Sequence, residues 1–186
     1  NNTVAAVDTD MNRMWKDSFN KDKSVVEEQA MAIVDKAGTT SAKNQVKGGA
    51  GSVVIDHSVA AGETLKGDIH THPYSTGEGG MTGVPFSGGD ISSLRGLVTQ
   101  GFQRLVEAGT ARFALVITDA KKATAWFAGI TDAKIQSDWD AAFAAGTGTF
   151  QENCAAAVYA VVGKSGANGI SFYGTTDKKK SKFVQM

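Results

Sequence analysis

The chain has 186 residues, of which 41% are hydrophobic and 20% are charged, and its 19 basic residues balance its 19 acidic ones. This composition is typical of one globular domain large enough to bury its own core, and the balanced charge provides no basic field to attract nucleic acid or a membrane surface. The single cysteine, Cys154, excludes an internal disulfide framework and a cysteine-rich zinc knuckle, and its apolar neighbours favour a buried thiol.

Long apolar segments and the two ends of the chain indicate where a protein acts and what it binds. No window approaches a membrane span, and no signal peptide is visible. The first residue is Asn1 and not methionine, which suggests a domain cut or processed from a longer protein. The lysine cluster near the end is interpreted as a solvated turn and consists of Lys178, Lys179, Lys180 and Lys182. We therefore expect a soluble domain with no nucleic-acid or membrane partner.

The first part of the chain predicts one helix and several strands. Apolar residues at helical spacing predict an amphipathic helix over residues 4–19. Alternating side chains predict a strand over residues 25–34. The next segments are interpreted as a loop with room for a short edge strand at 38–51 and as strands at 52–55 and 65–70.

A glycine-rich stretch separates this part from the second. Residues 75–89 hold too many glycines for a packed element and predict a long exposed loop, and such loops in compact domains are often functional. The elements predicted after it are an amphipathic helix over 91–106, a hairpin of strands 112–118 and 123–130, helices near 132–145 and 150–162, and strands at 169–174 and after the lysines.

Taken together, these elements predict a single α/β (α+β) domain with a mixed, mostly antiparallel sheet flanked by helices. An N-terminal helix occupies residues 1–23, the core that bears the motifs spans 25–130, and further helices and strands fill 131–186. No linker and no internal repeat divides the chain.

Two of the three histidines lie together at the end of a predicted strand. His70 and His72 are two residues apart, so their imidazoles project from the same face of an extended strand. Pro73 ends the strand, where the sheet edge opens to a cleft. Asp90, at the predicted start of a helix, adds a carboxylate whose ionised form the helix dipole favours. Two neutral nitrogens, one anionic oxygen and an open position suit a catalytic zinc ion, so the segment predicts a metal-dependent hydrolase.

Such a site also needs a base that takes a proton from the activated water. Glu28 is the first candidate, because its same-face neighbours on the predicted strand are small alanines. Glu27 competes with it, since alternation alone does not say which face points to the cleft. Glu63 and Glu78 are weaker candidates, because both lie in apparent loops. Ser87 is a candidate hydrogen-bond donor to the water or to the oxyanion of the transition state.

The order of these residues resembles a known signature. A His70-x-His72-Pro motif stands upstream of Ser87-x-x-Asp90. Together with a glutamate that opens an earlier strand, this pattern resembles the JAMM signature of the MPN (JAB) metalloprotease domains. The resemblance implies one Zn²⁺ ion held by the two histidines and the aspartate, with Glu28 acting as the base through water and Ser87 matching the family's serine.

The resemblance also implies a fold and a class of substrate. It implies an MPN/JAB-like α/β domain that hydrolyses peptide or isopeptide bonds of ubiquitin-like or other amide-linked proteins. Bacterial members of the family process sulfur carriers or form C-terminal toxin modules. The resemblance therefore implies a cognate immunity protein or a parent protein as a partner. It also implies a domain that acts in the bacterial cytoplasm or is exported within a longer protein. Thirteen residues separate Pro73 from Ser87, more than in the common pattern, and Ala30 and Ala32 replace its glycine-containing strand.

Other interpretations of the same residues stay open. Ser87-x-x-Asp90 before an apolar run is also a variant of a helix capping box. An MPN-type binding scaffold with a vestigial or structural metal site is the non-catalytic alternative. The segment from Asp68 to His72 also resembles the first motif of PHP-type phosphoesterases, but no histidine follows His72 to build that family's multinuclear site, which excludes this interpretation. His57 has no evident partner and is interpreted as an ordinary surface or core residue.

Overall fold

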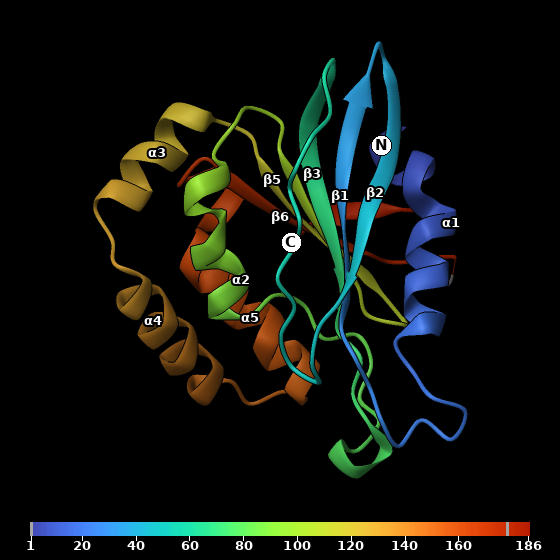
Figure 1. Ribbon diagram of the computed structural model, residues 1–186. Coiled ribbons are helices and arrows are strands. Elements are labelled where there is room, and N and C mark those ends of the chain that lie inside the picture. The colour runs from blue at the N-terminus through green and yellow to red at the C-terminus, as the bar shows by residue number, and fades with distance from the viewer. Residues whose placement is uncertain (1, 178) are drawn as a thin grey trace.

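A seven-stranded sheet forms the centre of the protein, which a computed structural model describes over residues 2–177 and 179–186 (Figure 1). The strands are β1 (Gln29–Lys36), β2 (Thr39–Lys47), β3 (Glu63–Thr71), β4 (Gln103–Glu107), β5 (Arg112–Ile117), β6 (Ile170–Thr175) and β7 (Phe183–Gln185). Their order in the sheet is β2-β1-β3-β4-β5-β6-β7. Within the described residues β3 and β4 are parallel and the other neighbours antiparallel, which confirms the mixed, mostly antiparallel sheet predicted from the sequence.

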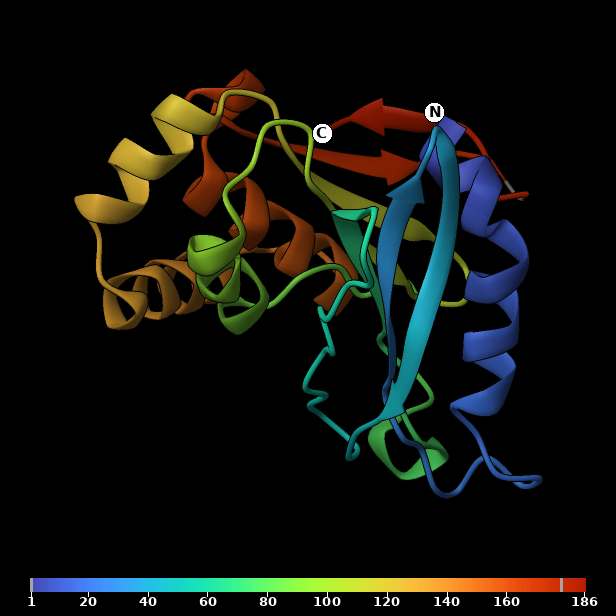
Figure 2. The same cartoon turned by 45° about the horizontal axis from the view of Figure 1, so that its top comes forward.

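Helices cover both faces of the sheet, as the two views show (Figures 1 and 2). The α-helices are α1 (Asn2–Asp17), α2 (Gly88–Ser92), α3 (Ala120–Ala128), α4 (Asp132–Ala145) and α5 (Phe150–Val162). Short 3-10 segments lie at Thr76–Glu78, Ser93–Leu97 and Lys164–Gly166. α1 lies alone on one face, and the other helices gather on the opposite face. No helix among the described residues is long and apolar enough to cross a membrane.

Alternation along β1 decides which of its side chains meets which layer. Met31 and Ile33 pack in the apolar cluster under α1. Ala30 and Ala32, which alternate with Met31 and Ile33 along the strand, must therefore point to the opposite face. Both faces are covered, so the six residues from Gln29 to Val34 are all buried. The same alternation directs Glu28 away from α1 and toward the face that carries α2.

The prediction of one amphipathic helix over residues 91–106 is wrong. The helix ends at Ser92 and, after a 3-10 segment, residues 103–107 form β4. The chain turns at Gly101, whose φ of +80° lies in the left-handed region that favours glycine. β4 is covered on both faces, so its neighbouring apolar residues are buried on opposite sides. A short apolar run of this kind has no period that distinguishes a buried strand from a helix.

Two further strand predictions are wrong. Residues 123–130, expected as the second arm of a hairpin, belong mostly to α3. Asp119 is the N-cap of this helix and accepts a hydrogen bond from the Lys122 amide at 3.1 Å. Residues 119–122, between the two predicted arms of the hairpin, therefore begin a helix and do not form a hairpin turn. Residues 52–55 form no strand; they run without regular structure beside the sheet.

The other predicted elements are present, α4 and α5 with the predicted bounds and the rest with shifted bounds. α1, α4, α5, β3, β5, β6 and β7 lie where helices and strands are expected. β1 begins at Gln29, four residues later than predicted. The segment 38–51 contains β2, a nine-residue edge strand, where the sequence indicates a loop with room for a short one.

A buried ion network ties α1 to the sheet. Glu107 and Arg112 are almost completely buried, and Arg112 Nε donates to Glu107 Oε2 at 2.7 Å. Arg112 also pairs with Asp8 of α1. Lys180 Nζ lies 2.6 Å from Glu107 Oε1, so this lysine of the predicted solvated turn is engaged in an ion pair, and Lys178 lies outside the described residues.

Replacing Arg112 by methionine is expected to lower the free energy of unfolding by about 3–5 kcal/mol, because it leaves the Glu107 carboxylate buried without its main partner. Denaturant unfolding measures the change. Lys134→Met is the matched control, since Lys134 and Asp138 form an exposed pair within α4 whose loss is expected to cost less than about 1 kcal/mol. Equal losses in the two variants would show that the buried network contributes no more than a surface pair.

Candidate metal centre

The end of β3 places the two histidines on the cleft side of the sheet. His70 is paired with Ala30 of β1, so both side chains leave the sheet on the face opposite α1. His72 follows the last residue of the strand, and its amide still donates to the Glu107 carbonyl at 3.1 Å. The ladder therefore continues far enough to keep both imidazoles on one face, as the sequence predicts, and Pro73 then ends it.

Asp90 reaches the same place from α2. Ser87 is the N-cap of this helix, and the Asp90 amide donates to Ser87 Oγ at 3.2 Å. In return the Ser87 amide and hydroxyl both donate to Asp90 Oδ2 at 2.7 Å. The capping-box interpretation is thus confirmed. The same bonds fix the Asp90 carboxylate in one orientation, so the box also orients the site.

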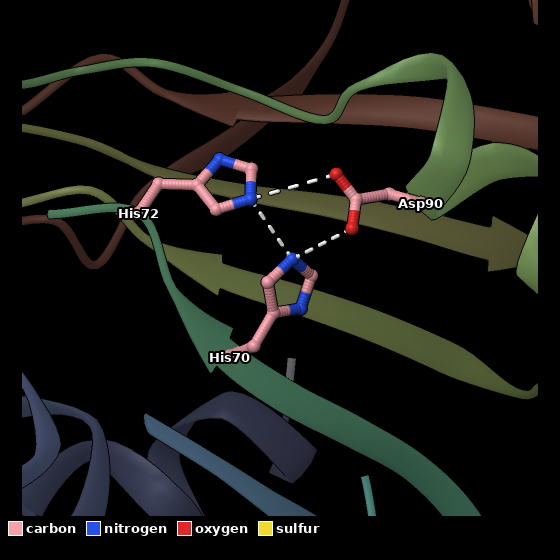
Figure 3. A group of neighbouring side chains, drawn as sticks. All are labelled: His70, His72 and Asp90. Atoms are coloured by element: carbon pink, nitrogen blue, oxygen red, sulfur yellow. Dashed lines mark hydrogen bonds and ion pairs between the residues drawn. The ribbon is translucent and has the colours of Figure 1, made fainter. Parts of the chain in front are cut away.

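Three potential metal ligands converge within the cleft (Figure 3). His70 Nε2 lies 3.0 Å from His72 Nε2 and 3.0 Å from Asp90 Oδ1, and His72 Nε2 lies 3.5 Å from Asp90 Oδ2. Around a tetrahedral zinc ion with bonds of about 2.0–2.1 Å, neighbouring ligand atoms are about 3.3 Å apart. The group therefore has the atoms and the spacing to hold a metal ion.

The charges of the group suit a cation. Burial acts to raise the pKa of the Asp90 carboxyl, but the two facing imidazoles outweigh it and hold that pKa well below its usual range. Burial lowers the pKa of His70, which favours its neutral form. For His72 the Asp90 carboxylate outweighs burial and raises the pKa. An anionic oxygen thus faces two nitrogen donors, of which His70 is held neutral.

The outer ring nitrogens of the two histidines differ in their support. His72 Nδ1 lies 3.2 Å from the Val84 carbonyl, which requires the proton on Nδ1, so in the neutral ring the lone pair is on Nε2, the atom that faces the group. His70 Nδ1 is buried and, in the part of the chain that the structure describes, has no hydrogen-bond partner. No hydrogen bond to Nδ1 among the described residues therefore helps to orient the His70 ring.

Glu28 lines the same cleft and Glu27 does not. The Glu28 side chain is 9% exposed, and burial, which outweighs the opposing effect of His72, raises its pKa to about 7, with Asp90 adding to the rise. The Glu27 side chain is 45% exposed and pairs with Lys47 at 3.1 Å. Alternation along β1 separates the two, so the geometry favours Glu28 as the candidate base.

The two weaker candidates are engaged by other groups. Glu63 is at the other end of β3 and pairs with Lys43 at 2.6 Å. Glu78 lies at the cleft wall, where its carboxylate accepts from the amide and hydroxyl of Ser75 at 2.9 Å. Both carboxylates are occupied by these contacts.

The cleft around the group has a volume of about 730 Å³ and is open to solvent. The irregular segment 50–57 forms one wall, and Leu97, Trp139 and Phe150 contribute to the wall that the helices form. Cys154 also lines it and is 1% exposed, which confirms the predicted buried thiol. Burial raises the pKa of this thiol to about 11, so it is not activated as a nucleophile.

A second polar cluster in the cleft has no counterpart in the sequence interpretation. Arg104 donates to both carboxylate oxygens of Asp68, at 2.9 and 2.7 Å. His57 Nε2 lies 2.9 Å from Asp68 Oδ2, so the interpretation of His57 as a residue without partners is wrong. The position of Asp68 two residues before His70 signals a shared face, but no local pattern pairs it with residues 11 and 36 positions away.

Replacing Ser87 by alanine is expected to weaken zinc binding about 10-fold or more, because outer contacts that orient a ligand are commonly worth 10–100-fold in affinity. It should also lower the free energy of unfolding by about 1 kcal/mol through loss of the cap. Isothermal titration and denaturant unfolding measure the two effects. Thr149→Ala is the matched control, since Thr149 forms the same capping box with Glu152 at the start of α5. A Thr149 variant that loses as much zinc affinity would contradict an orienting role for Ser87.

Comparisons with family models, with curated proteins and with solved structures find no match for this chain. The resemblance to the JAMM signature therefore stays a prediction from the residues themselves.

Proposed function

We propose that this domain is a zinc-dependent amide hydrolase of the JAMM type, acting on peptide or isopeptide bonds. The observation that carries the proposal is the convergence of His70, His72 and Asp90 in an open cleft that Glu28 also lines. The order of these residues along the chain, with the glutamate before the histidines and the serine and aspartate after them, agrees with the resemblance drawn from the sequence.

The residues of the group fit zinc by chemistry as well as by spacing. Two imidazole nitrogens and one carboxylate oxygen are a donor set of catalytic zinc sites, which keep a further position for water or substrate. His70, His72 and Asp90 would hold the ion. When bound, zinc supplies a Lewis acid that acidifies water and polarises the scissile carbonyl.

Glu28 supplies the proton transfer in this proposal. A carboxyl group whose pKa is about 7 exchanges protons readily near neutral pH. It takes the proton from the attacking water and passes it to the leaving amine.

Ser87 contributes through Asp90. Its hydroxyl donates to Asp90 Oδ2 and thereby holds one metal ligand in place. Stabilisation of the oxyanion, the role expected from the sequence, would require this hydroxyl to turn away from Asp90. We therefore assign Ser87 first to positioning the carboxylate.

The proposed substrate class comes from the resemblance to the JAMM signature, and the open cleft is compatible with it. We propose a protein or peptide substrate with a ubiquitin-like or other amide linkage, and a role as the effector or toxin domain of a larger bacterial protein with a cognate immunity or parent protein. The buried Glu28 in the same cleft as the complete ligand group favours this enzymatic role over a non-catalytic scaffold, because a structural metal site needs its ligands but no neighbouring base.

A substrate panel with and without metal tests the proposal. The purified protein is assayed against ubiquitin-like conjugates, isopeptide-linked peptides and peptidoglycan-type amides, after removal of metal by a chelator and after return of one equivalent of zinc. We expect at least one amide to be cleaved only in the presence of zinc. Cleavage that continues undiminished in the metal-free protein would reject the zinc mechanism.

A further inference from the structure

The cluster of Asp68, Arg104 and His57 lies beside the metal group without belonging to it. Asp68 and Arg104 face each other across the parallel pair β3 and β4, and both side chains are almost completely buried. Asp68 is two residues before His70 on the same strand, so it projects from the same face. The charge pair is therefore built into the floor of the cleft, next to the histidines.

One guanidinium joins the two elements that carry the metal ligands. Nε and Nη2 of Arg104 bind Asp68 on β3, the strand that ends with the histidines. Nη1 of the same group donates to the main-chain carbonyl of Asp90 at 2.7 Å and also to Ser93 Oγ. Asp68 orients the guanidinium, and the guanidinium holds α2.

The hydrogen bonds of Arg104 fix the position of α2 relative to the sheet, which the capping contacts of Asp90 do not. Ser87 orients the carboxylate within α2 but does not fix α2 relative to the sheet. Ile91 and Leu94 attach α2 and the 3-10 segment after it to the apolar core by packing, which has no preferred hydrogen-bond direction. Metal ligands must be held within about 0.5 Å of their working positions, and a planar guanidinium with several bonds at fixed angles can do this.

We propose that Arg104, held by Asp68, is a positioning residue that fixes Asp90 relative to His70 and His72 and so sets the metal affinity of the centre. The inference rests on the proposed metal site but not on the proposed hydrolytic activity. Lysine cannot replace Arg104 in this role, because one ammonium group cannot span Asp68 and the Asp90 carbonyl in the same planar geometry.

Metal affinity measured on matched pairs of variants tests the inference. Zn²⁺ and Co²⁺ are titrated into the metal-free protein and into R104K and R104M, with R112K and R112M as controls. Arg112 is equally buried and pairs with the buried Glu107, but its side chain contacts α1 on the opposite face of the sheet. His57→Ala removes the other partner of Asp68 while leaving the contact between Arg104 and Asp90.

We expect both Arg104 variants to bind metal about 10–100-fold more weakly than the unchanged protein and to alter the visible spectrum of bound Co²⁺, which reports its coordination. The Arg112 and His57 variants should keep the affinity and the spectrum. Circular dichroism checks folding, and R104K, which keeps a positive charge opposite Asp68, is the variant that decides if R104M does not fold.

Three results would overturn the inference, and they differ in whether they also affect the proposed metal site. Wild-type affinity and an unchanged Co²⁺ spectrum in R104K, or equal losses in the Arg104 and Arg112 variants, would remove the positioning role and leave the proposed function intact. Failure of the unchanged protein to bind either metal would overturn the metal site and this inference together.

Discussion

Replacing His72 by alanine is expected to remove zinc from the protein and to abolish amide hydrolysis. His72 Nε2 is one of only three converging donor atoms found among the described residues, and its Nδ1 is anchored on the Val84 carbonyl. Loss of a direct ligand should cost more affinity than the 10–100-fold that loss of an outer contact costs. Zinc content measured by elemental analysis, together with the rate of cleavage, reports both effects.

His57→Ala is the matched control for this variant, because His57 lines the same cleft but stands outside the metal group. It should keep about one zinc per chain, the ratio expected for one three-residue site. Zinc retained at that level in His72→Ala would refute the ligand set. Zinc lost equally from both variants would point to a site of different composition.

Replacing Glu28 by glutamine is expected to leave zinc bound and to lower kcat by about 10²–10⁴-fold, the usual contribution of a general acid–base residue. Glutamine keeps the size and polarity of the side chain but cannot accept or deliver the proton. Steady-state kinetics on the cleaved substrate and zinc content on the same sample measure the two outcomes.

Glu27→Gln is the control next in the chain, because the Glu27 carboxylate pairs with Lys47 outside the cleft. Its kcat should stay at the wild-type level. A loss in Glu27→Gln with no loss in Glu28→Gln would move the base by one residue and contradict the strand alternation that the structure shows. Unchanged rates in both would reject a glutamate base altogether.

Unfolding of the metal-free Glu28→Gln variant separates a catalytic loss from misfolding. Burial raises the folded-state pKa of Glu28 to about 7, above its ordinary value in an unfolded chain. The unfolded state therefore releases its proton at lower pH, and the native protein loses stability between these two values and stays lower above pH 7. Glutamine carries no such proton, so the variant should gain relative stability as the pH rises through this range.

The sequence predicts the metal group because each of its residues belongs to a short pattern of neighbouring residues. The spacing of His70 and His72 on a strand that ends at Pro73 places two imidazoles on one face, and the structure has them there. Ser87 and Asp90 occupy the first and last positions of a capping box, a pattern of four residues. The strand, its end and the cap each depend on neighbours in the chain, so single-sequence reasoning reaches them.

What the sequence does not predict depends on distant partners. Strand alternation leaves Glu27 and Glu28 equal until α1 is known to cover the face of Met31. The salt bridge between Arg104 and Asp68 joins residues that are 36 positions apart in the chain. Arg104 lies in a segment whose apolar residues also fit a helix, so the sequence does not place it in a strand beside Asp68. His57 comes from a segment without regular structure, which no periodicity describes.

Crystallographic anomalous scattering at the zinc absorption edge, on protein crystallised with zinc, tests the central claim most directly. The account predicts a single anomalous peak within bonding distance of His70 Nε2, His72 Nε2 and an Asp90 carboxylate oxygen, in the cleft that Glu28 lines. A fully occupied peak held by other residues, or the absence of any peak at these three atoms at saturating zinc, would contradict it.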